Sequence, residues 1–284
     1  VGASLAGVRS IVTMKHVGMN VAAEVLHFAG YTGVRAGLVV VIGSDPGATS
    51  STSEQDDRWY SLHTHLPILE PSSIQEAKDF TASAFELSER HNLPVIVNAP
   101  SKLCHNIGSL RLGALPAVFP AGGRFERNPT RYINLFGGSV ANHRRAMEAV
   151  ENLRGDAPTL GLNRVLEGSG RIGFISSSVN YLYLIEALSL LGILDAPVLK
   201  IGMSYPLNAG EIASFAAELE RVYVVEDLEG FIEFQAKRLL YDSGIRVPVV
   251  GKDVFPAYGE LDVDLIAERL SDELRAPLPS RMTR

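Results

Sequence analysis

Three polar side chains near the start of the chain have the types and spacing to do chemistry together. Lys15, His16 and Asn20 follow directly after residues 11–13, an apolar β-branched run that predicts a short buried strand. Histidine titrates near neutral pH, so His16 can orient a ligand or exchange a proton with it. A structural hydrogen-bonding role for His16 is the alternative. In open α/β sheets, ligands bind in loops at the carboxyl ends of strands, and we therefore expect a ligand site at residues 15–20.

A second loop has the same character. The apolar strand predicted at residues 37–42 ends in residues 43–51, which are rich in glycine, serine and threonine and include Ser44 and Asp45. Glu54 and Gln55 follow at the start of a helix that we expect Ser53 to cap. We predict that this loop and residues 15–20 face one cleft. The other interpretation is that the acidic residues only complement a helix dipole.

The elements that must position these loops alternate along the chain. Strands are predicted at residues 67–71 and 94–98, with helices at residues 21–28 and 74–91. Continuous apolar strands between helices indicate a mainly parallel sheet covered on both faces. The periodicity fades over residues 101–171, where only a helix at 142–153 stands out.

A second alternating series follows the irregular stretch. Its predicted strands are residues 171–176, 197–201, 222–225 and 247–250, and its predicted helices are residues 180–191, 210–219, 230–243 and 263–275. The chain is therefore predicted to be an α/β protein with two doubly wound, mainly parallel βα domains.

Composition excludes several classes of protein. The 284 residues are 46% hydrophobic and carry a net charge of −6 without a basic cluster, which argues against a nucleic-acid surface. The single cysteine, Cys104, excludes a disulfide framework and a Cys-ligated cluster within this chain. No apolar run reaches the roughly 20 residues of a membrane span, so we expect a cytoplasmic protein. Residues 1–7 read as the interior of a small-residue helix, which suggests a piece of a longer chain.

Other motifs have plain structural interpretations. Residues 168–173 match GxGxxG but precede their strand, so a turn is expected rather than a dinucleotide site. The serines at 176–178 could bind an anion or cap a helix, and the acidic run 226–229 could form a site or cap the next helix. His63 and His65 are two residues apart in a predicted helix and point in different directions, so we expect no metal site.

Several segments resemble one enzyme family when they are taken in order. The chain is similar to the alpha subunit of indolepyruvate ferredoxin oxidoreductases, within the thiamine-diphosphate-dependent 2-oxoacid oxidoreductases. The segments that carry the resemblance are Thr13-Met-Lys-His-Val-Gly-Met-Asn-Val-Ala-Ala23, Asp45-Pro-Gly47, Glu54-Gln-Asp56, Asn128-Pro-Thr-Arg-Tyr132, Val198-Leu-Lys-Ile-Gly-Met-Ser-Tyr-Pro206 and Val224-Val-Glu-Asp-Leu-Glu-Gly-Phe-Ile-Glu233.

The resemblance implies a domain plan and a set of cofactors. Residues 1–125 would be a pyrimidine-binding domain that lacks its N-terminal part and the family's pyrimidine-activating glutamate. Residues 126–170 would be a linker with one helix, and residues 171–284 a domain like the C-terminal domain of transketolase. Thiamine diphosphate with Mg²⁺ would be bound mainly by a pyrophosphate-binding domain or subunit outside this chain. Iron–sulfur clusters elsewhere, coenzyme A, a smaller beta subunit and ferredoxin would complete the reaction.

The resemblance also implies roles for individual residues. His16 and Lys15 would be catalytic, and the cofactor would be lined by Asn20, Ser44, Asp45, Glu54 and Gln55. Lys102 and His105 would contact the substrate; the family has an arginine at the position of Lys102, and the two side chains bind carboxylates differently. The implied reaction is oxidative decarboxylation of an aryl 2-oxoacid such as indolepyruvate to an acyl-CoA. The rival interpretations are a non-oxidative thiamine-dependent decarboxylase and a non-catalytic assembly subunit.

Overall fold

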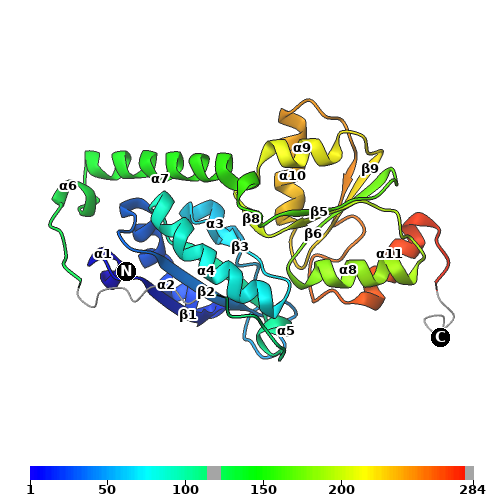
Figure 1. Cartoon of the computed structure of the whole chain (residues 1–284), viewed down its shortest axis with the longest axis horizontal. Helices are drawn as coiled ribbons and strands as arrows, with labels where there is room; N and C mark the ends of the chain where they lie inside the picture. The colour runs from blue at the N-terminus through cyan, green and yellow to red at the C-terminus, as the bar shows by residue number, and fades with distance from the viewer. Residues whose placement is uncertain (114–122, 279–284) are drawn as a thin grey trace. The chain divides into compact units, whose positions relative to one another are not determined.

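The chain divides into two compact α/β units. A computed structural model describes residues 1–113 and 123–278 (Figure 1). Unit 1 consists of Val1–Ser44 and Asp57–Asp156, and unit 2 consists of Asp45–Asp56 and Ala157–Arg284. The helix expected at 142–153 therefore belongs to unit 1. Part of the irregular stretch around residues 108–132 lies outside the described residues.

Unit 1 is built on a parallel sheet. Its strands are β1 (Ser10–Lys15), β2 (Leu38–Ser44), β4 (Val95–Pro100) and β3 (Ile68–Leu69), which lie side by side in that order. The side chains of β4 are buried throughout, as is typical of a strand covered on both faces. The parallel sheet predicted from the continuous apolar runs is confirmed.

The helices of unit 1 cover both faces of this sheet. The helix α2 (His16–Thr32) connects β1 to β2, and α4 (Ile74–His91) connects β3 to β4 in the opposite direction across the sheet. Because such crossovers are right-handed, the two helices lie on opposite faces. Ser73 caps α4 by accepting from the amide of Glu76. The shorter helices are α1 (Gly2–Leu5), α3 (Trp59–Thr64), α5 (Ser101–Cys104) and α6 (Pro129–Tyr132), and the long helix α7 (Gly137–Asp156) ends the unit.

Two arginines attach α6 and α7 to the rest of unit 1. The guanidinium of Arg145 on α7 donates to the carbonyls of Gly30 and Tyr31, and that of Arg131 on α6 donates to the carbonyls of Thr32 and Val34. Burial, and secondarily the charge of Arg131, lowers the pKa of Arg145 to about 10. These bonds satisfy carbonyl groups at and just beyond the end of α2, which have no partner within the helix.

Unit 2 has a sheet of similar design with one reversed strand. Its order is β10 (Val249–Val250), β9 (Arg221–Val225), β6 (Ile172–Ser177), β7 (Val198–Ile201) and β5 (Arg164–Leu166). All neighbours are parallel except β5, which pairs antiparallel with β7. The sequence did not predict β5, because its three residues are exposed and have no apolar run around them. The short strand β8 (Met203–Tyr205) and the 3₁₀ turn η1 (Ala157–Thr159) complete the strands and turns.

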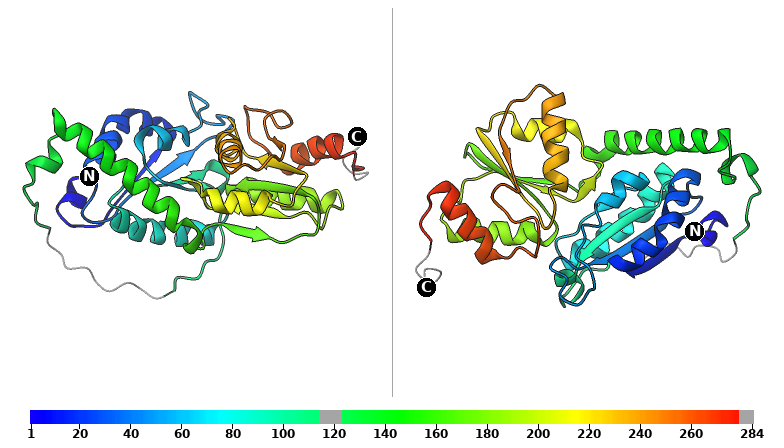
Figure 2. Two further views of the ribbon diagram at one scale, coloured as in Figure 1. Left: turned by 90° about the horizontal axis from the view of Figure 1, so that it is seen from above. Right: turned by 180° about the vertical axis from the view of Figure 1, so that it is seen from behind.

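One face of the unit 2 sheet packs on α8 (Ser178–Leu190) and α11 (Val263–Leu274). Phe174, Val198 and Tyr223 fill this core and are fully buried. The helices α9 (Ala209–Ala216) and α10 (Phe231–Asp242) lie on the other face, as Figures 1 and 2 show. None of the helices among residues 1–113 and 123–278 is both long and apolar enough to cross a bilayer.

Two local predictions were wrong. Residues 15–20 are not a loop, because β1 leads directly into α2 at His16. This tight junction brings Gly18 so close to Met14 that a Cβ atom on Gly18 would lie 3.0 Å from the Met14 Cβ. Ser53 also caps no helix, since α3 begins only at Trp59. The carboxylate of Glu54 instead accepts hydrogen bonds from the backbone of Gly47 and of Gly259.

Candidate functional site at the strand ends of unit 1

Three strand ends meet at the carboxyl edge of the unit 1 sheet. The register places Lys15 of β1 beside Gly43 of β2, and Ser44 beside Pro100 of β4. His16 and Lys102 follow at the first turns of α2 and α5, so the sheet brings four of the predicted site residues to one edge. The adjacency of the β1 and β2 ends is confirmed.

His16 and Asn20 differ in exposure and in partners. His16 is only 1% exposed, whereas Asn20 lies one turn further along α2 and is exposed. The hydroxyl of Tyr60 donates to the Asn20 side-chain oxygen at 2.6 Å. Burial, and secondarily the carboxylate of Asp57, raises the pKa of Tyr60, so its phenol stays protonated as a donor. Tyr60 was missed because a single tyrosine in a short helix gives no sequence signal.

A buried pair lies at the next two strand ends. Glu70 follows β3 and Asn98 lies near the end of β4, and the Asn98 amide nitrogen donates to the Glu70 carboxylate at 3.2 Å. Both residues are more than 90% buried. Among the described residues none donates to the side-chain oxygen of Asn98. Like Lys15 and Ser44, this pair lies at strand ends, but neither residue was predicted to belong to the site.

The remaining predicted residues are distributed between the two units. Asp45, Glu54 and Gln55 belong to the segment of unit 2 that follows β2. Asp45 is buried, and one of its carboxylate oxygens accepts from the amide of Ser50 and the hydroxyl of Ser51. His105 is exposed and ends α5.

Cys104 lies on the same short helix α5 as Lys102. Its thiol donates to the carbonyl of Ala99, and burial raises its pKa. A thiol held in the protonated form is a poor nucleophile. The geometry therefore assigns no reaction to Cys104.

Four other histidines of unit 1 make ring contacts, namely His27, His63, His65 and His143. The His63 ring packs edge-on against His27 with centroids 4.2 Å apart, while the Nε2 atoms of His65 and His143 are 3.2 Å apart. Tyr31 stacks on His143. His63 and His65 thus face different partners, as their spacing predicts.

The flagged motifs of unit 2 serve the fold. Residues 168–170 form a turn in which a Cβ on Gly168 would lie 2.2 Å from the carbonyl oxygen of Asp195. The hydroxyl of Ser176 donates to the carbonyl of Val225. The carboxylate of Glu226 accepts from the amides of Ile232 and Glu233, in the first turn of α10. The helix-capping alternative for Glu226 is confirmed, and residues 168–171 precede β6, as the sequence indicates.

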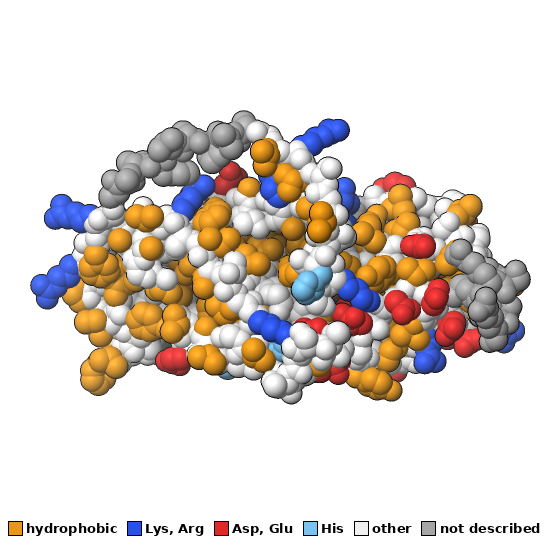
Figure 3. Space-filling view, turned by 90° about the horizontal axis from the view of Figure 1, so that it is seen from below, with side chains coloured by type: hydrophobic (Ala, Val, Ile, Leu, Met, Phe, Trp, Pro, Cys, Tyr) orange, Lys and Arg blue, Asp and Glu red, His pale blue; other side chains and the backbone are white. Residues whose placement is uncertain are grey.

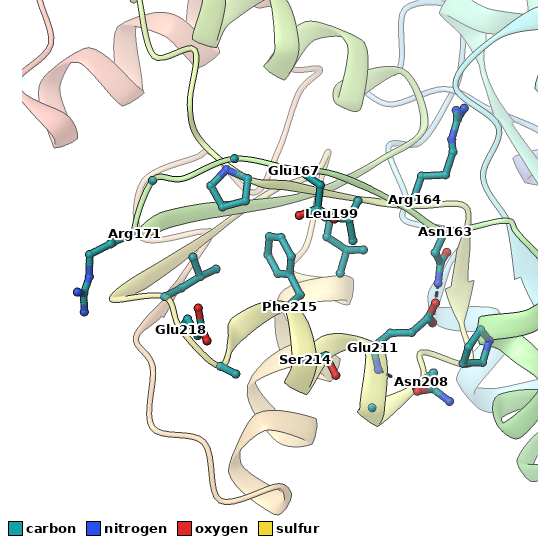
Figure 4. A pocket seen from close by; sticks show the side chains of 18 of the residues that line it. Asn163, Arg164, Glu167, Arg171, Leu199, Asn208, Glu211, Ser214, Phe215 and Glu218 are labelled. Carbon is teal, nitrogen blue, oxygen red and sulfur yellow. Dashed lines mark hydrogen bonds between the residues drawn. The ribbon is translucent and has the colours of Figure 1, made fainter.

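Unit 2 also contains a groove of about 1260 Å³ between β5 and α9 (Figure 4). Leu199 and Phe215 lie in its lining, and the carboxylate of Glu211 accepts from the amide of Asn163 at 3.0 Å. Burial raises the pKa of Glu211. None of the predicted site residues lines this groove.

Comparison with known proteins divides the chain at nearly the same place as the structure. A family model described as "Pyruvate flavodoxin/ferredoxin oxidoreductase, thiamine diP-bdg" matches residues 1–156, and one described as "Indolepyruvate oxidoreductase domain" matches residues 164–278.

Curated relatives cover almost the whole chain. Indolepyruvate oxidoreductase subunit IorA of Pyrococcus abyssi is 38% identical over 283 residues, which is 98% of this chain and 44% of the relative. The IorA subunit of Archaeoglobus fulgidus is 39% identical over 84% of this chain and 38% of its own length. The chain therefore spans less than half the length of these relatives.

Solved structures share the fold. The chain of a 2-oxoglutarate:ferredoxin oxidoreductase from Magnetococcus marinus aligns over 96% of this chain and 54% of its own length, with a TM-score of 0.67 and 17% identity. A split gene transketolase aligns over 97% of this chain and 79% of its own length, with a TM-score of 0.61 and 15% identity. At these identities the likeness supports the α/β fold alone.

Proposed function

The chain belongs to the pyruvate flavodoxin/ferredoxin oxidoreductase family, and from this premise we propose that unit 1 forms the pyrimidine-facing half of a thiamine diphosphate site. The enzyme we propose is a 2-oxoacid oxidoreductase that decarboxylates an aryl pyruvate, with indolepyruvate as the preferred substrate. The names of the relatives that align with 98% of the chain support this substrate.

The observation that carries the proposal is that polar residues lie side by side at three adjacent strand ends. Lys15, Ser44 and Lys102 lie at or just beyond the carboxyl ends of β1, β2 and β4, which neighbour one another in the sheet. Open α/β sheets bind ligands at this edge. Two lysines there would attract an anionic 2-oxoacid.

The residues at this edge fit an aminopyrimidine ring, which carries both donors and acceptors. The buried side-chain oxygen of Asn98 receives no hydrogen bond from the described residues and can accept one from an amino group. The side-chain oxygen of Asn20 accepts from Tyr60, which orients the amide group, and the nitrogen of that group is a hydrogen-bond donor. Asn20, Ser44 and Asn98 are therefore the residues that would hold the ring, with Asp45 and Gln55 as further candidates.

The protein's own groups would place and protonate the reactants. Bound thiamine diphosphate supplies the electron sink that makes loss of CO₂ from a 2-oxoacid possible. His16 is buried at the start of α2 and would hold or transfer a proton at the reacting centre. Lys15 and Lys102 would pair with the substrate carboxylate, and a lysine does so as a point charge rather than a bidentate fork. His105 would lie at the rim.

The complete reaction needs groups that this chain does not supply. We propose that acyl transfer to coenzyme A follows decarboxylation and that the electrons pass through iron–sulfur clusters to ferredoxin. A single cysteine cannot ligate such a cluster. The clusters, the Mg²⁺ and pyrophosphate site, and the smaller beta subunit would therefore lie in other parts of the assembly. A cytoplasmic location is part of the same proposal.

The test is an activity assay on the complete enzyme with its partner subunit. Indolepyruvate should reduce a viologen dye in the presence of coenzyme A and thiamine diphosphate, with formation of an acyl-CoA. Aldehyde release without an electron acceptor would identify a non-oxidative decarboxylase instead. If activity persisted in an assembly lacking this chain, a non-catalytic assembly role would replace the proposal.

A further inference from the structure

The segment Asp45–Asp56 leaves unit 1 at the end of β2 and makes its contacts in unit 2, before the chain returns to unit 1 at Asp57. It begins directly beyond Ser44, a residue of the proposed cofactor edge. The interactions that order Asp45–Asp56 therefore also order the residues immediately after β2.

Glu54 makes the long-range hydrogen bond of this segment. Its Oε1 atom accepts from the amide of Gly47 at 2.9 Å and from the amide of Gly259 at 2.7 Å. The second bond joins residues 205 positions apart in the sequence. One carboxylate oxygen of Glu54 thus bonds both to Gly47, near the start of the segment, and to Gly259, in the turn that precedes α11.

The two glycines are suited to this arrangement. Gly47 has φ of +80° and Gly259 has φ of +74°, in the region of backbone space that favours glycine. A Cβ on Gly47 would lie 3.1 Å from the Cγ atom of Glu260, so the segment packs directly on the neighbour of Gly259. The position of the segment is therefore set by hydrogen bonds and by close packing.

Asp45 orders its own end of the segment. Its carboxylate accepts from the amide of Ser50 and from the hydroxyl of Ser51, five and six residues further on. This arrangement closes a local turn. Glu54 adds a link from the segment to the turn at Gly259.

We propose that Glu54 is a positioning residue that holds Asp45–Asp56 on the turn at Gly259 and so orders the chain beyond β2 for the cofactor. The functional part of this inference rests on the proposed thiamine diphosphate site. In this proposal Glu54 does not contact the cofactor directly. It acts by ordering the segment Asp45–Asp56. The part that concerns loop order stands on the hydrogen bonds alone.

The first test measures amide hydrogen exchange at Gly47 and Gly259. Glu54→Ala removes the acceptor, and exchange at both amides should become about three- to tenfold faster. Glu54→Gln retains a side-chain carbonyl and should restore slow exchange. Thr52→Ala, a substitution of an exposed residue in the same segment, serves as the matched control. Unchanged exchange in Glu54→Ala would overturn the proposal.

The second test uses the complete enzyme. In Glu54→Ala the KM for thiamine diphosphate should rise about three- to tenfold with a smaller change in kcat, and Glu54→Gln should restore the KM. Faster exchange with an unchanged KM would overturn the positioning role. An inactive wild-type assembly would count against the proposed function only, since the exchange measurement does not depend on activity.

Discussion

The two units place polar side chains at the same edge of similar sheets but use them differently. In unit 2 the polar groups bond to backbone: Ser176 donates to the carbonyl of Val225, and Glu226 accepts from two amides of α10. In unit 1 two pairs of side chains bond to each other, Tyr60 with Asn20 and Asn98 with Glu70. A side chain bonded to backbone holds a helix in place, whereas a bond between two side chains can be exchanged for a bond to a ligand. The comparison thus distinguishes a strand end that serves stability from one that suits binding.

The surfaces of unit 1 add to this contrast. Several apolar side chains of β1 and α2 are substantially exposed, including Ile11 at 50%, Val21 at 88% and Val25 at 52%. Figure 3 shows hydrophobic side chains reaching the surface on the face that it draws. A helix that is apolar on most of its circumference is usually covered, which agrees with a unit that works in an assembly.

The largest effect is expected from Glu226→Ala in unit 2. The substitution leaves two buried amides of α10 without an acceptor and should lower the free energy of unfolding by about 3 kcal/mol. Chemical denaturation checks this value, with exposed Glu268→Ala as the control expected within about 0.5 kcal/mol of the wild type. A loss no larger than that of the control would show that Glu226 does not support α10.

His16→Ala probes the corresponding edge of unit 1. If His16 transfers a proton, turnover of the complete enzyme should fall about tenfold or more. The control is His63→Ala, because His63 is exposed and its ring packs against His27. This substitution should leave turnover unchanged. Wild-type turnover in His16→Ala would leave the residue a structural role.

Tyr60→Phe removes a single hydroxyl and should act on binding rather than stability. Without the bond from Tyr60, Asn20 is less well oriented, and the KM for thiamine diphosphate should rise about fivefold, which corresponds to about 1 kcal/mol. Steady-state kinetics at varied cofactor concentration checks this, and thermal unfolding is the control for stability. An unchanged KM would remove Asn20 from the residues that hold the ring.

The smallest effect concerns the pH dependence of unit 1. Burial is the main cause that lowers the pKa of His65 and of His91, and the neighbouring His143 lowers the pKa of His65 further. The ordinary pKa of histidine is about 6.5, so near this pH these two histidines bind more protons in the unfolded chain than in the folded chain. The free energy of unfolding should therefore decrease as the pH falls from about 7.5 to about 5.5.

Thermal unfolding of the wild type and of His65→Gln across this pH range measures the contribution of His65. The variant should lose part of the pH dependence, because glutamine does not titrate. Identical slopes in the two proteins would assign the dependence to other groups.

Much of the fold follows from local sequence patterns. The buried apolar runs predicted the parallel strands, and the helical spacing of apolar residues predicted α4, because both patterns depend on residues close together in the sequence. The family membership predicted from the ordered motifs is also confirmed. The strand-end rule correctly brought Lys15 and Ser44 to neighbouring strand ends.

Other features were decided only by tertiary contacts. No helix begins at Ser53, and the Glu54 carboxylate instead bonds to Gly259, a partner 205 residues away that no local pattern reveals. The reversed strand β5 and the bond from Tyr60 to Asn20 likewise depend on segments far apart in the sequence. Sequence by itself determined most of the parallel strands and long helices and which residue types stand at the strand ends. The tertiary structure decided which of those side chains hold the fold together and which line the proposed site, because that depends on the partners that folding brings to each side chain.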